Sequence, residues 1–398
     1  MIETILLKKI VGGTMYYKAY KFRIYPNESQ KELINKTFGC NRFVYNFFLS
    51  KIKENKYTKA TENIKYYTNY LKYEYPFLQE IDSIVIRKSL FNLEDSFKRY
   101  FKKQNDYPKF KSKFNRNSYN TNAIYNSYKN NNYCNIELDL ENKTIKLPKL
   151  KNVKIRGYRN LKYINGRILN ATILRESNGK YYVSVLYEMS EKIKEVTPAS
   201  IVGIDLGIKK LLTLSDGNSY ENNKYIEKYK KRIKRMQREL SRKVKGSNNY
   251  YKCKKKLAIL HSKLANSRKY YIHKITKNIT DEYDIITCEK LHTKEMIING
   301  KKNTLSKNIN DACFNEILKQ LEYKSKFKGK KFYQIYEYYP SSQTCSRCDN
   351  QDKKYKNLNE RTYECTKCHL EIDRDINASI NIMFEGLKMY IENNTNLV

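Results

Sequence analysis

Three acidic residues occupy positions where an isolated carboxylate would be costly. Asp205 lies inside the apolar stretch Ile201–Ser215, and Glu289 ends a short apolar strand expected within Tyr283–Met296. Asp375 stands at the start of an apolar helix. A carboxylate in an apolar strand needs a cation or another charge beside it. Carried on two strands and one helix, the three acids can form a cluster that holds two Mg²⁺ or Mn²⁺ ions. Such a cluster activates water and stabilises the leaving oxygen of a phosphodiester.

Each of these acids also has a purely structural explanation. Asp205 can belong to a turn at the end of its strand. Asp373 or Asp375 can be the N-cap of the helix that follows, because an Asp side chain accepts hydrogen bonds from the first free amides of a helix. The combination of the three acids therefore carries the prediction of a metal site, and no single acid does.

Four of the nine cysteines form two C-x-x-C pairs. Cys345 and Cys348 are the first pair, and Cys365 and Cys368 follow after sixteen intervening residues. Two such turns place four thiolates tetrahedrally around Zn²⁺. Four thiolates leave no open position, so we predict a structural zinc, with the adjacent His369 as a bystander. The other five are expected to be small core residues: Cys40, Cys134, Cys253, Cys288 and Cys313.

The composition indicates a polyanionic partner. The 398 residues include 79 Lys and Arg against 41 Asp and Glu, a formal net charge of +38. A nucleic acid is the simplest partner for such a charge, and the many tyrosines offer faces that could stack on bases. We find no signal peptide and no apolar span of about 18 residues, and therefore expect a cytoplasmic protein without a membrane partner.

The amino-terminal half carries the signals of a β-barrel interrupted by helices. Residues 16–26 alternate as a strand does, and helical patterns cover about 27–51, 60–74 and 83–103. Short strands resume between residues 136 and 189. Asn178 and Gly179 between two alternating strands predict a hairpin. We therefore predict a barrel made of 15–26 and 132–195, a helical insert at 27–131, and a possible extension at 1–14.

The carboxyl-terminal half places a helical hairpin between the first two acids. Residues 222–281 are expected to form two long basic helices that turn near Gly246–Asn249. An apolar stripe on each helix predicts their seam, and nucleic-acid binding accounts best for the Lys and Arg outside it. A helix around Asp311–Lys326 and a strand at Lys331–Tyr339 should follow. The stripes are Ile233, Met236, Leu240 and Val244, and Leu257, Leu260, Leu264 and Tyr271.

These ordered motifs resemble the TnpB (OrfB) family, transposon-encoded relatives of the type V CRISPR effector nucleases. VGIDLGIKKLLTLSDG is similar to the first RuvC motif of that family, and CEKL to the second. PSSQTCSRC…YECTKC…DRDINASINI is similar to its zinc ribbon followed by the third motif. YKFRIYPNESQKELINKTFGCNRFVYNFFL resembles its opening segment, and IKLPKLKNVKIRGYR and ATILRESNGKYYVSVLYE its barrel. The resemblance extends from about Tyr16 to Phe384.

The resemblance implies an α/β multi-domain fold. Its main part would be an RNase H-like (RuvC) nuclease domain at 200–340 and 370–392, interrupted by the helical hairpin and by a zinc ribbon at 341–369. The barrel would be the "wedge" domain, and its insert a helical recognition domain. Asp205, Glu289 and Asp375 would be the catalytic carboxylates, with Asp373 as the less favoured alternative to Asp375.

The resemblance also implies an activity. Family members use an RNA from their own transposon end to cleave matching double-stranded DNA beside a short transposon-adjacent motif, so that base pairing reads the sequence. We therefore expect an RNA-guided, Mg²⁺- or Mn²⁺-dependent endonuclease with two metal ions at the nuclease site and one structural Zn²⁺. Two alternatives remain. A catalytically silent RNA-guided repressor would be expected to lose the acids, and an RNase H-like strand-transfer transposase would use the same metal chemistry.

The residues that read the adjacent motif do not transfer from the family. The basic, aromatic and polar stretch at 106–123 is typical of a loop that contacts phosphates and bases, or of an ordinary solvated loop. Because DNA is the expected target, we also predict association with the nucleoid, and we expect a monomer. The predicted nucleic-acid contacts are Lys109, Lys111, Tyr119, Thr121 and Asn122.

Overall fold

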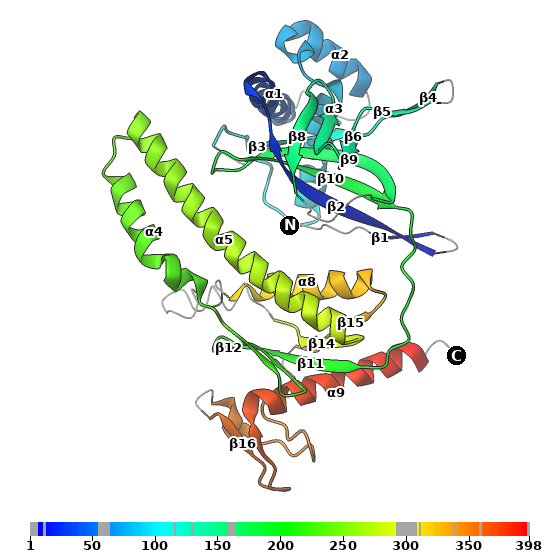
Figure 1. The fold of residues 1–398 in the computed structure, drawn as a ribbon, viewed down its shortest axis with the longest axis vertical. Coiled ribbons are helices and arrows are strands. Elements are labelled where there is room, and N and C mark those ends of the chain that lie inside the picture. Colours follow the sequence, from blue (N-terminus) through cyan, green and yellow to red (C-terminus); the bar gives the residue numbers. More distant parts are fainter. Residues whose placement is uncertain are drawn as a thin grey trace. The chain divides into compact units, whose positions relative to one another are not determined.

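The computed structural model forms two units, Met1–Lys192 and Ile193–Val398 (Figure 1). Each unit has its own main sheet and hydrophobic core. Among the residues that the structure describes, no helix combines the length and hydrophobicity needed to cross a membrane. The described residues are 7–10, 13–54, 64–114, 117–128, 131–157, 164–291, 309, 312–337, 339–357 and 360–395.

The first unit is built on an antiparallel sheet with the order β3-β9-β10-β2-β8-β7-β6, and β1 pairs with the start of β2. We predicted a barrel, and the described residues form a half-barrel sheet with β3 and β6 at its edges (Figure 1). A separate ribbon joins β4 to β5. The strands are β1 (Leu7–Ile10), β2 (Gly13–Tyr25), β3 (Asn117–Asn122), β4 (Tyr125–Tyr128), β5 (Asn131–Cys134), β6 (Glu137–Asp139), β7 (Thr144–Leu147), β8 (Lys151–Arg156), β9 (Gly166–Arg175) and β10 (Tyr181–Met189).

Alternation in the sequence decides which face of this sheet is buried. Along β10 every second side chain is buried, as the pleat of a strand requires. Val183 and Val185 are fully buried, whereas Ser184 between them is not. The predicted hairpin between β9 and β10 is present, and its Gly179 has φ +82°, a value that glycine adopts without strain.

Helices α1 (Glu28–Lys53) and α3 (Ser83–Phe101) pack against the buried side of the sheet and share its core. Asn27 begins α1 with a capping box, because its side chain accepts from the amide of Gln30 while the Gln30 side chain accepts from the amide of Asn27. Between the two helices lie α2 (Ile64–Glu74) and a short 3₁₀ turn (Pro76–Gln79). Residues 60–63 of the predicted second helix lie outside the described residues.

One boundary of the first unit was predicted wrongly. Asn117–Asn122, which we placed in the helical insert and in a loop, forms β3 and pairs with β9. The segment is rich in Asn and lacks the β-branched residues that favour strands, apart from Thr121, so its sequence hides the pairing. Part of the predicted extension at 1–14 also forms structure, since Leu7–Ile10 pairs with the start of β2.

The second unit contains a five-stranded sheet with the order β13-β12-β11-β14-β15. β11 and β12 form an antiparallel hairpin, whereas β11, β14 and β15 run parallel. Residues 292–296 of the stretch predicted to hold the second acid lie outside the described residues. The strands are β11 (Ile201–Leu206), β12 (Lys210–Leu214), β13 (Ser219–Glu221), β14 (Ile285–Glu289) and β15 (Lys331–Ile335).

Helices cover both faces of this second sheet. On one face, Val202 and Ile286 share a core with residues of α5 (Asn248–Glu282) and α8 (Phe314–Phe327). On the other face lies α9 (Arg374–Thr395), which crosses β11 and β14 (Figure 1). Since both faces are covered, the two central strands are apolar almost throughout.

Two glycines allow α9 to approach the sheet closely. A methyl group at Gly203 of β11 would lie 2.0 Å from the carbonyl oxygen of Ser379, and one at Gly386 of α9 would lie 1.9 Å from the Thr287 methyl group on β14. Neither distance is possible between non-bonded heavy atoms, so both positions require glycine in this packing. The helix is therefore held against the two strands that carry the first two acids.

The predicted helical hairpin consists of α4 (Tyr225–Ser241) and α5, packed against each other. Ser247 caps α5 by accepting a hydrogen bond from the amide of Tyr250. Leu260 and Leu264 of α5 are buried, in agreement with the predicted seam, and Cys253 is buried, as expected for a small core residue. Val244 is 78% exposed, contrary to the prediction, because α4 ends before it at Ser241.

Candidate active site and zinc ribbon

The sheet brings Asp205 and Glu289 side by side. The parallel register sets Ile204 of β11 opposite Cys288 of β14, so the next residue on each strand is an acid. Side chains alternate between the faces of a strand, and Gly203 and Thr287, two positions earlier, lie against α9. Asp205 and Glu289 therefore project from the same end of the sheet toward the side that α9 covers.

Asp375 completes this group from the first turn of α9. Its neighbour Asp373 has a different role, because Oδ1 of Asp373 accepts the amide of Asp375 at 2.8 Å and that of Ile376 at 3.3 Å. Asp373 is thus the helix cap, and its other oxygen lies 3.4 Å from Nζ of Lys210. Capping therefore accounts for Asp373, and the prediction of Asp375 as the third acid of the cluster keeps its geometric support.

Electrostatics link the three acids. Burial raises the pKa of Asp205 to about 8, and the nearby carboxylates of Glu289 and Asp375 contribute to this rise. Burial also raises the pKa of Glu289, an effect partly opposed by the hydroxyl of Ser341, which donates a hydrogen bond to Oε1. Carboxylates that disfavour one another's charge form a site that a divalent cation would stabilise, and their hard oxygen atoms are the donors that Mg²⁺ and Mn²⁺ prefer.

The four predicted zinc ligands form one compact group. The Sγ atoms of Cys345 and Cys368 lie 3.5 Å apart, as do those of Cys348 and Cys365, and all four lie within 4.8 Å of one another. Four thiolates at the usual Zn–S distance of about 2.3 Å would be about 3.8 Å apart, so the group fits a structural zinc. His369 is exposed and lies outside the group.

The zinc ribbon has a small core of its own. Tyr355 and Tyr363 are buried with their ring centroids 4.3 Å apart, beside the cysteines. The hydroxyl of Tyr355 donates to the carbonyl of Glu364 and accepts its amide. The second cysteine pair lies between β16 (Thr362–Glu364) and β17 (Glu371–Asp373), and β17 leads directly into α9. The ribbon therefore determines where α9 begins.

Polar side chains connect the zinc ribbon to the start of α9. Arg374 is 5% exposed, and its guanidinium donates to the carbonyls of Asn357 and Glu360 and to Oγ of Ser342. From the ribbon, Nη1 of Arg361 lies 3.8 Å from Oδ2 of Asp375. The ribbon thus contacts both the start of α9 and one of the three acids.

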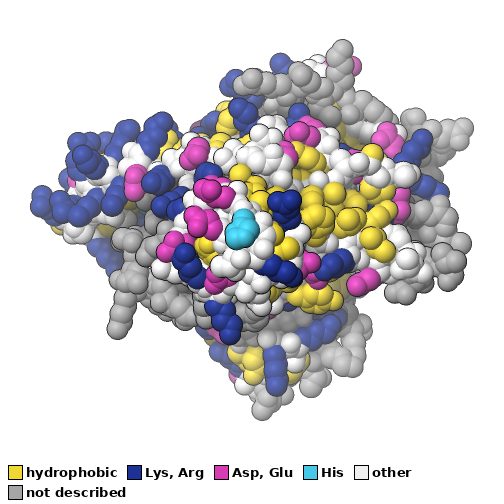
Figure 2. Space-filling view, turned by 90° about the horizontal axis from the view of Figure 1, so that it is seen from below, with side chains coloured by type: hydrophobic (Ala, Val, Ile, Leu, Met, Phe, Trp, Pro, Cys, Tyr) yellow, Lys and Arg dark blue, Asp and Glu magenta, His cyan; other side chains and the backbone are white. Residues whose placement is uncertain are grey.

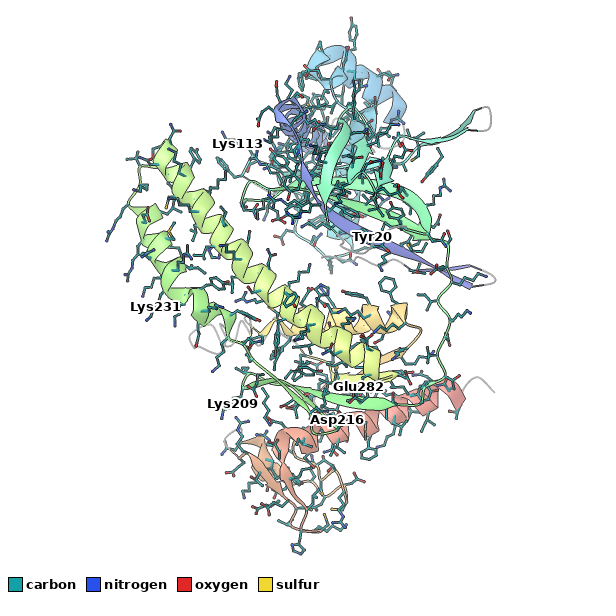
Figure 3. All side chains as sticks on the ribbon, in the orientation of Figure 1. Tyr20, Lys113, Lys209, Asp216, Lys231 and Glu282 are labelled. Atoms are coloured by element: carbon teal, nitrogen blue, oxygen red, sulfur yellow. The ribbon has the colours of Figure 1, made fainter. Side chains whose placement is uncertain are left out.

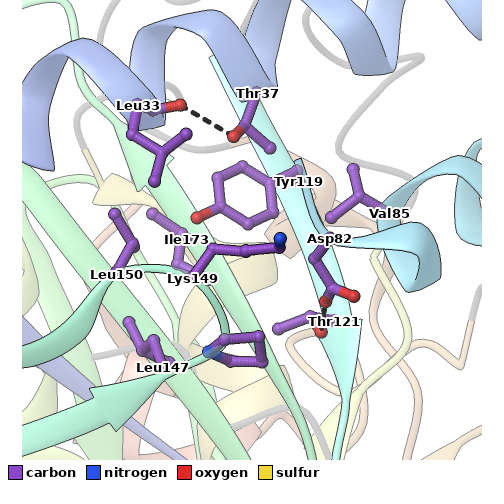
Figure 4. Close-up of a pocket in the computed structure, with 11 residues that line it drawn as sticks. Leu33, Thr37, Asp82, Val85, Tyr119, Thr121, Leu147, Lys149, Leu150 and Ile173 are labelled. Atoms are coloured by element: carbon purple, nitrogen blue, oxygen red, sulfur yellow. Dashed lines mark hydrogen bonds between the residues drawn. The ribbon is translucent and has the colours of Figure 1, made fainter. Parts of the chain in front are cut away.

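Two of the predicted nucleic-acid contacts are core residues. Tyr119 is 6% and Thr121 is 1% exposed, because alternate side chains of β3 turn toward α1 and α3 (Figure 4). The Thr121 hydroxyl donates to Asp82, which caps α3, and the Tyr119 ring packs edge-on against Phe38. This burial does not support the prediction that the two side chains contact DNA. The polar composition of the segment concealed the fact that these two positions of the strand face inward.

The other three predicted contacts are accessible to different degrees. Lys109 is exposed and pairs with Asp106, and Asn122 is partly exposed. The ammonium of Lys111 lies 3.6 Å from the centre of the Tyr45 ring, and burial lowers its pKa to about 8. Lys111 also lines a polar cavity of about 450 Å³ at the β3 edge of the first sheet, bordered by residues of α1, α3, β3 and β9.

This cavity contains residues that the sequence did not single out. Arg42 and Lys88 contribute positive charge, and Nη1 of Arg42 donates to Oδ1 of Asn117 at 2.7 Å. Burial lowers the pKa of Arg42, and the charge of Arg175 adds to this effect. Asn120 and Asn170 add amide groups. One sequence signal could have identified Asn120: side chains alternate between the two faces of β3, so Asn120 turns outward when Tyr119 and Thr121 turn inward.

The helical hairpin is strongly basic on its outer surface. Figure 3 shows side chains radiating from both helices, with Lys231 on the side of α4 that faces away from α5. In Figure 2, Lys and Arg gather at the left edge, where this hairpin extends. Two glutamates, Glu227 and Glu239, flank the cationic series on α4, which comprises Lys228, Lys230, Lys231, Arg232, Lys234, Arg235 and Arg238.

Three family models match the chain. Residues 184–299 match OrfB_IS605, described as a probable transposase. Residues 314–382 match the TNB domain of Cas12f1-like proteins, a range that contains α8, the ribbon and the start of α9. Residues 15–60 match a helix-turn-helix domain model of the OrfB_IS605 group, although the described part of this range forms β2 and α1.

Similar proteins cover nearly the whole chain. A protein of Streptomyces pristinaespiralis named as an RNA-guided DNA endonuclease is 31% identical, over 93% of this chain and 89% of its own. A protein of Escherichia coli K12, named as RNA-guided DNA endonuclease InsQ, is 32% identical, over 93% of this chain and 92% of its own. In structure, the chain resembles Cas12f1 as seen by cryo-EM in its complex with sgRNA and target DNA. The TM-score is 0.60 at 15% identity, over 93% of this chain and 99% of the other.

Proposed function

Because the chain belongs to the TnpB (OrfB) family, we propose that it is an RNA-guided endonuclease that cleaves double-stranded DNA by metal-dependent phosphodiester hydrolysis. The observation that carries this proposal is the convergence of Asp205, Glu289 and Asp375 at one end of the second sheet. A repressor without cleavage would have no use for three acids that converge on a partly buried site.

Each acid would have a distinct role in holding the metal ions. Asp205 lies between the other two electrostatically, since both raise its pKa, and would contact both ions. Glu289 is oriented by Ser341, and Asp375 by the cap of α9. When bound, two Mg²⁺ or Mn²⁺ ions supply an activated water and neutralise charge on the leaving oxygen. Arg361 beside Asp375 would then be available to bind a DNA phosphate.

The outer surface of the α4–α5 hairpin supports nucleic-acid binding in the second unit. Its exposed Lys and Arg side chains would neutralise phosphates of the guide RNA or its duplex with DNA without reading sequence, a contact that weakens steeply with salt. Base pairing with the guide would select the target, which leaves the protein to recognise the short adjacent motif.

For that recognition we propose the polar cavity of the first unit in place of Tyr119 and Thr121. Arg42, Lys88 and Lys111 can contact phosphates, and the amides of Asn120 and Asn170 can donate to and accept from base edges. Lys109 and Asn122, both accessible, remain proposed contacts near it. Single alanine substitutions at Asn120 and Lys88 separate base reading from phosphate binding, since only the loss of a base contact should change which adjacent motif is cleaved.

The test of the nuclease site is plasmid cleavage by the purified protein–RNA complex. The double substitution Asp205→Ala with Glu289→Ala should abolish cleavage while target binding persists. Asp373→Asn is the matched control, because Asn also caps helices and this acid is not assigned to the metal site. Undiminished cleavage by the double variant would refute the site. Target binding without cleavage by the wild type would favour a repressor, and joined transposon ends a strand-transfer transposase.

A further inference from the structure

The segment that leads into the zinc ribbon also contacts the nuclease site. Ser341 follows β15 and precedes Cys345 by four residues, and its hydroxyl donates a hydrogen bond to Oε1 of Glu289. Ser341 is 5% exposed, so water competes little for this hydrogen bond. One side chain therefore connects an acid of the sheet to the chain segment that enters the zinc site.

Two asparagines of α9 hold the backbone around Ser341. Nδ2 of Asn381 donates to the carbonyls of Ser341 and Thr344, at 2.8 and 2.7 Å. Asn377, one turn earlier on α9, donates to the Thr344 carbonyl at 2.7 Å and accepts the Ser346 amide at 3.0 Å. Both asparagines are buried, at 0% and 3% exposure for Asn377 and Asn381. The helix that carries Asp375 thus fixes the turn that orients Glu289.

The zinc ligands hold the same turn at its other end. The amide of Cys345 donates to the carbonyl of Asn350, and Thr344 donates to the carbonyl of Pro340 through both its amide and its hydroxyl. Cys345 is itself fully buried. Releasing the thiolates would free this end of the turn, and with it the position of the Ser341 hydroxyl.

We propose that Ser341 is a positioning residue for Glu289, through which occupancy of the cysteine site sets the affinity of the carboxylate site for divalent cations. This inference rests on the proposed nuclease function, since it assumes that Glu289 is a metal ligand. Hydrogen bonds from outer groups to ligating carboxylates fix their orientation, and their loss commonly weakens metal binding about 10- to 100-fold.

The test measures Mn²⁺ binding by the full-length chain without RNA, from the electron paramagnetic resonance signal of free Mn²⁺. Ser341→Ala should raise the Kd about 10-fold or more, and Ser341→Thr, which keeps the hydroxyl, should restore most of the affinity. Ser346→Ala is the matched control, because Ser346 contacts α9 through its backbone amide. Zinc content and thermal melting of each variant identify any loss of the ribbon fold.

Coupling to zinc is tested in the same assay. Removal of zinc with a zinc-selective chelator, followed by dialysis, should weaken Mn²⁺ binding by the wild type but hardly further by Ser341→Ala, since both changes act through one hydrogen bond. Unchanged Mn²⁺ affinity in a folded, zinc-loaded Ser341→Ala chain would overturn the inference alone. If Asp205→Ala with Glu289→Ala bound Mn²⁺ as the wild type does, the proposed metal site itself would fail, and the inference with it.

Discussion

The two main sheets differ in how their faces are covered, and this difference explains where chemistry can be located. In the first unit the strand β10 alternates between buried and partly exposed side chains, so polar residues have a place all along it. In the second unit β14 is buried from Ile285 to Cys288, and its first partly exposed residue is Glu289. A sheet covered on both faces leaves its strand ends as the place for polar side chains, and the acids occur there.

The largest effect is expected where α9 closes over the second sheet. Gly203→Val would drive a side chain into the backbone of α9, and should destabilise the second unit by about 3 kcal/mol or more. Gly39→Ala in α1 is the control, because no atom lies within 4 Å of its added methyl group; alanine there should stabilise by about 0.5–1 kcal/mol. Urea unfolding measures both, and a tolerated Gly203→Val would contradict the close packing.

The alternation in the first sheet is tested at two neighbouring positions of β3. Tyr119→Ala removes a buried ring and should cost about 3 kcal/mol. Asn120→Ala, on the opposite face, should cost less than about 1 kcal/mol and instead weaken DNA binding. Thermal melts and binding of the RNA complex to its target separate these effects. Equal losses of stability would mean that the register of β3 is not the one described.

A smaller effect is expected for Glu289, at the carboxyl end of β14. Because burial raises the pKa of Glu289, its charge disfavours the folded state of the metal-free protein. Glu289→Gln should therefore stabilise that protein by about 1 kcal/mol at pH 7 while abolishing cleavage. The difference should vanish as the pH falls below 4.5, the ordinary pKa of Glu, where both side chains are neutral. A destabilised variant at pH 7 would assign Glu289 a structural role.

The smallest effect is expected for Asp284, which directly precedes the amino-terminal end of β14. The amide of Ala199 lowers the pKa of Asp284, as does Lys330, whose Nζ lies 3.1 Å from Oδ1. Its ionised form stabilises the fold above the ordinary pKa of 3.8, and this contribution is lost as the pH falls through the lower folded value. Asp284→Asn should remove less than about 1 kcal/mol at pH 7, as followed by acid titration, without affecting cleavage.

The second unit was the more predictable from the sequence. Asp205 is recognisable because it lies inside an apolar stretch, and Glu289 because it ends one. The cysteine spacing predicts the ribbon. Asp284 has a similar position, yet it is paired and structural, so an acid beside a strand is not a sufficient signal. Ser341 and Arg361 had no signal at all, because their roles depend on how the ribbon folds back on the sheet.

The first unit was predicted less well for a physical reason. Its helices and most of its strands follow from periodicity, but β3 consists of Asn, Ser, Tyr and Thr, which suit a loop as well as a strand. Pairing with β9 and packing against α1 decide its structure, and neither is encoded locally. Tyr119 and Thr121 therefore appeared to be surface contacts, while the cavity formed by Arg42, Lys88 and the asparagines remained hidden.

The position of α9 in the chain has a consequence for biosynthesis. Asp205 and Glu289 emerge from the ribosome well before Asp375, and the helix that bears Asp375 is also the element that covers one face of their sheet. A growing chain therefore holds two unshielded acids and no complete site until the ribbon and α9 have been made. If the three acids form the proposed nuclease site, the order of synthesis delays the capacity to cut DNA until α9 has been made.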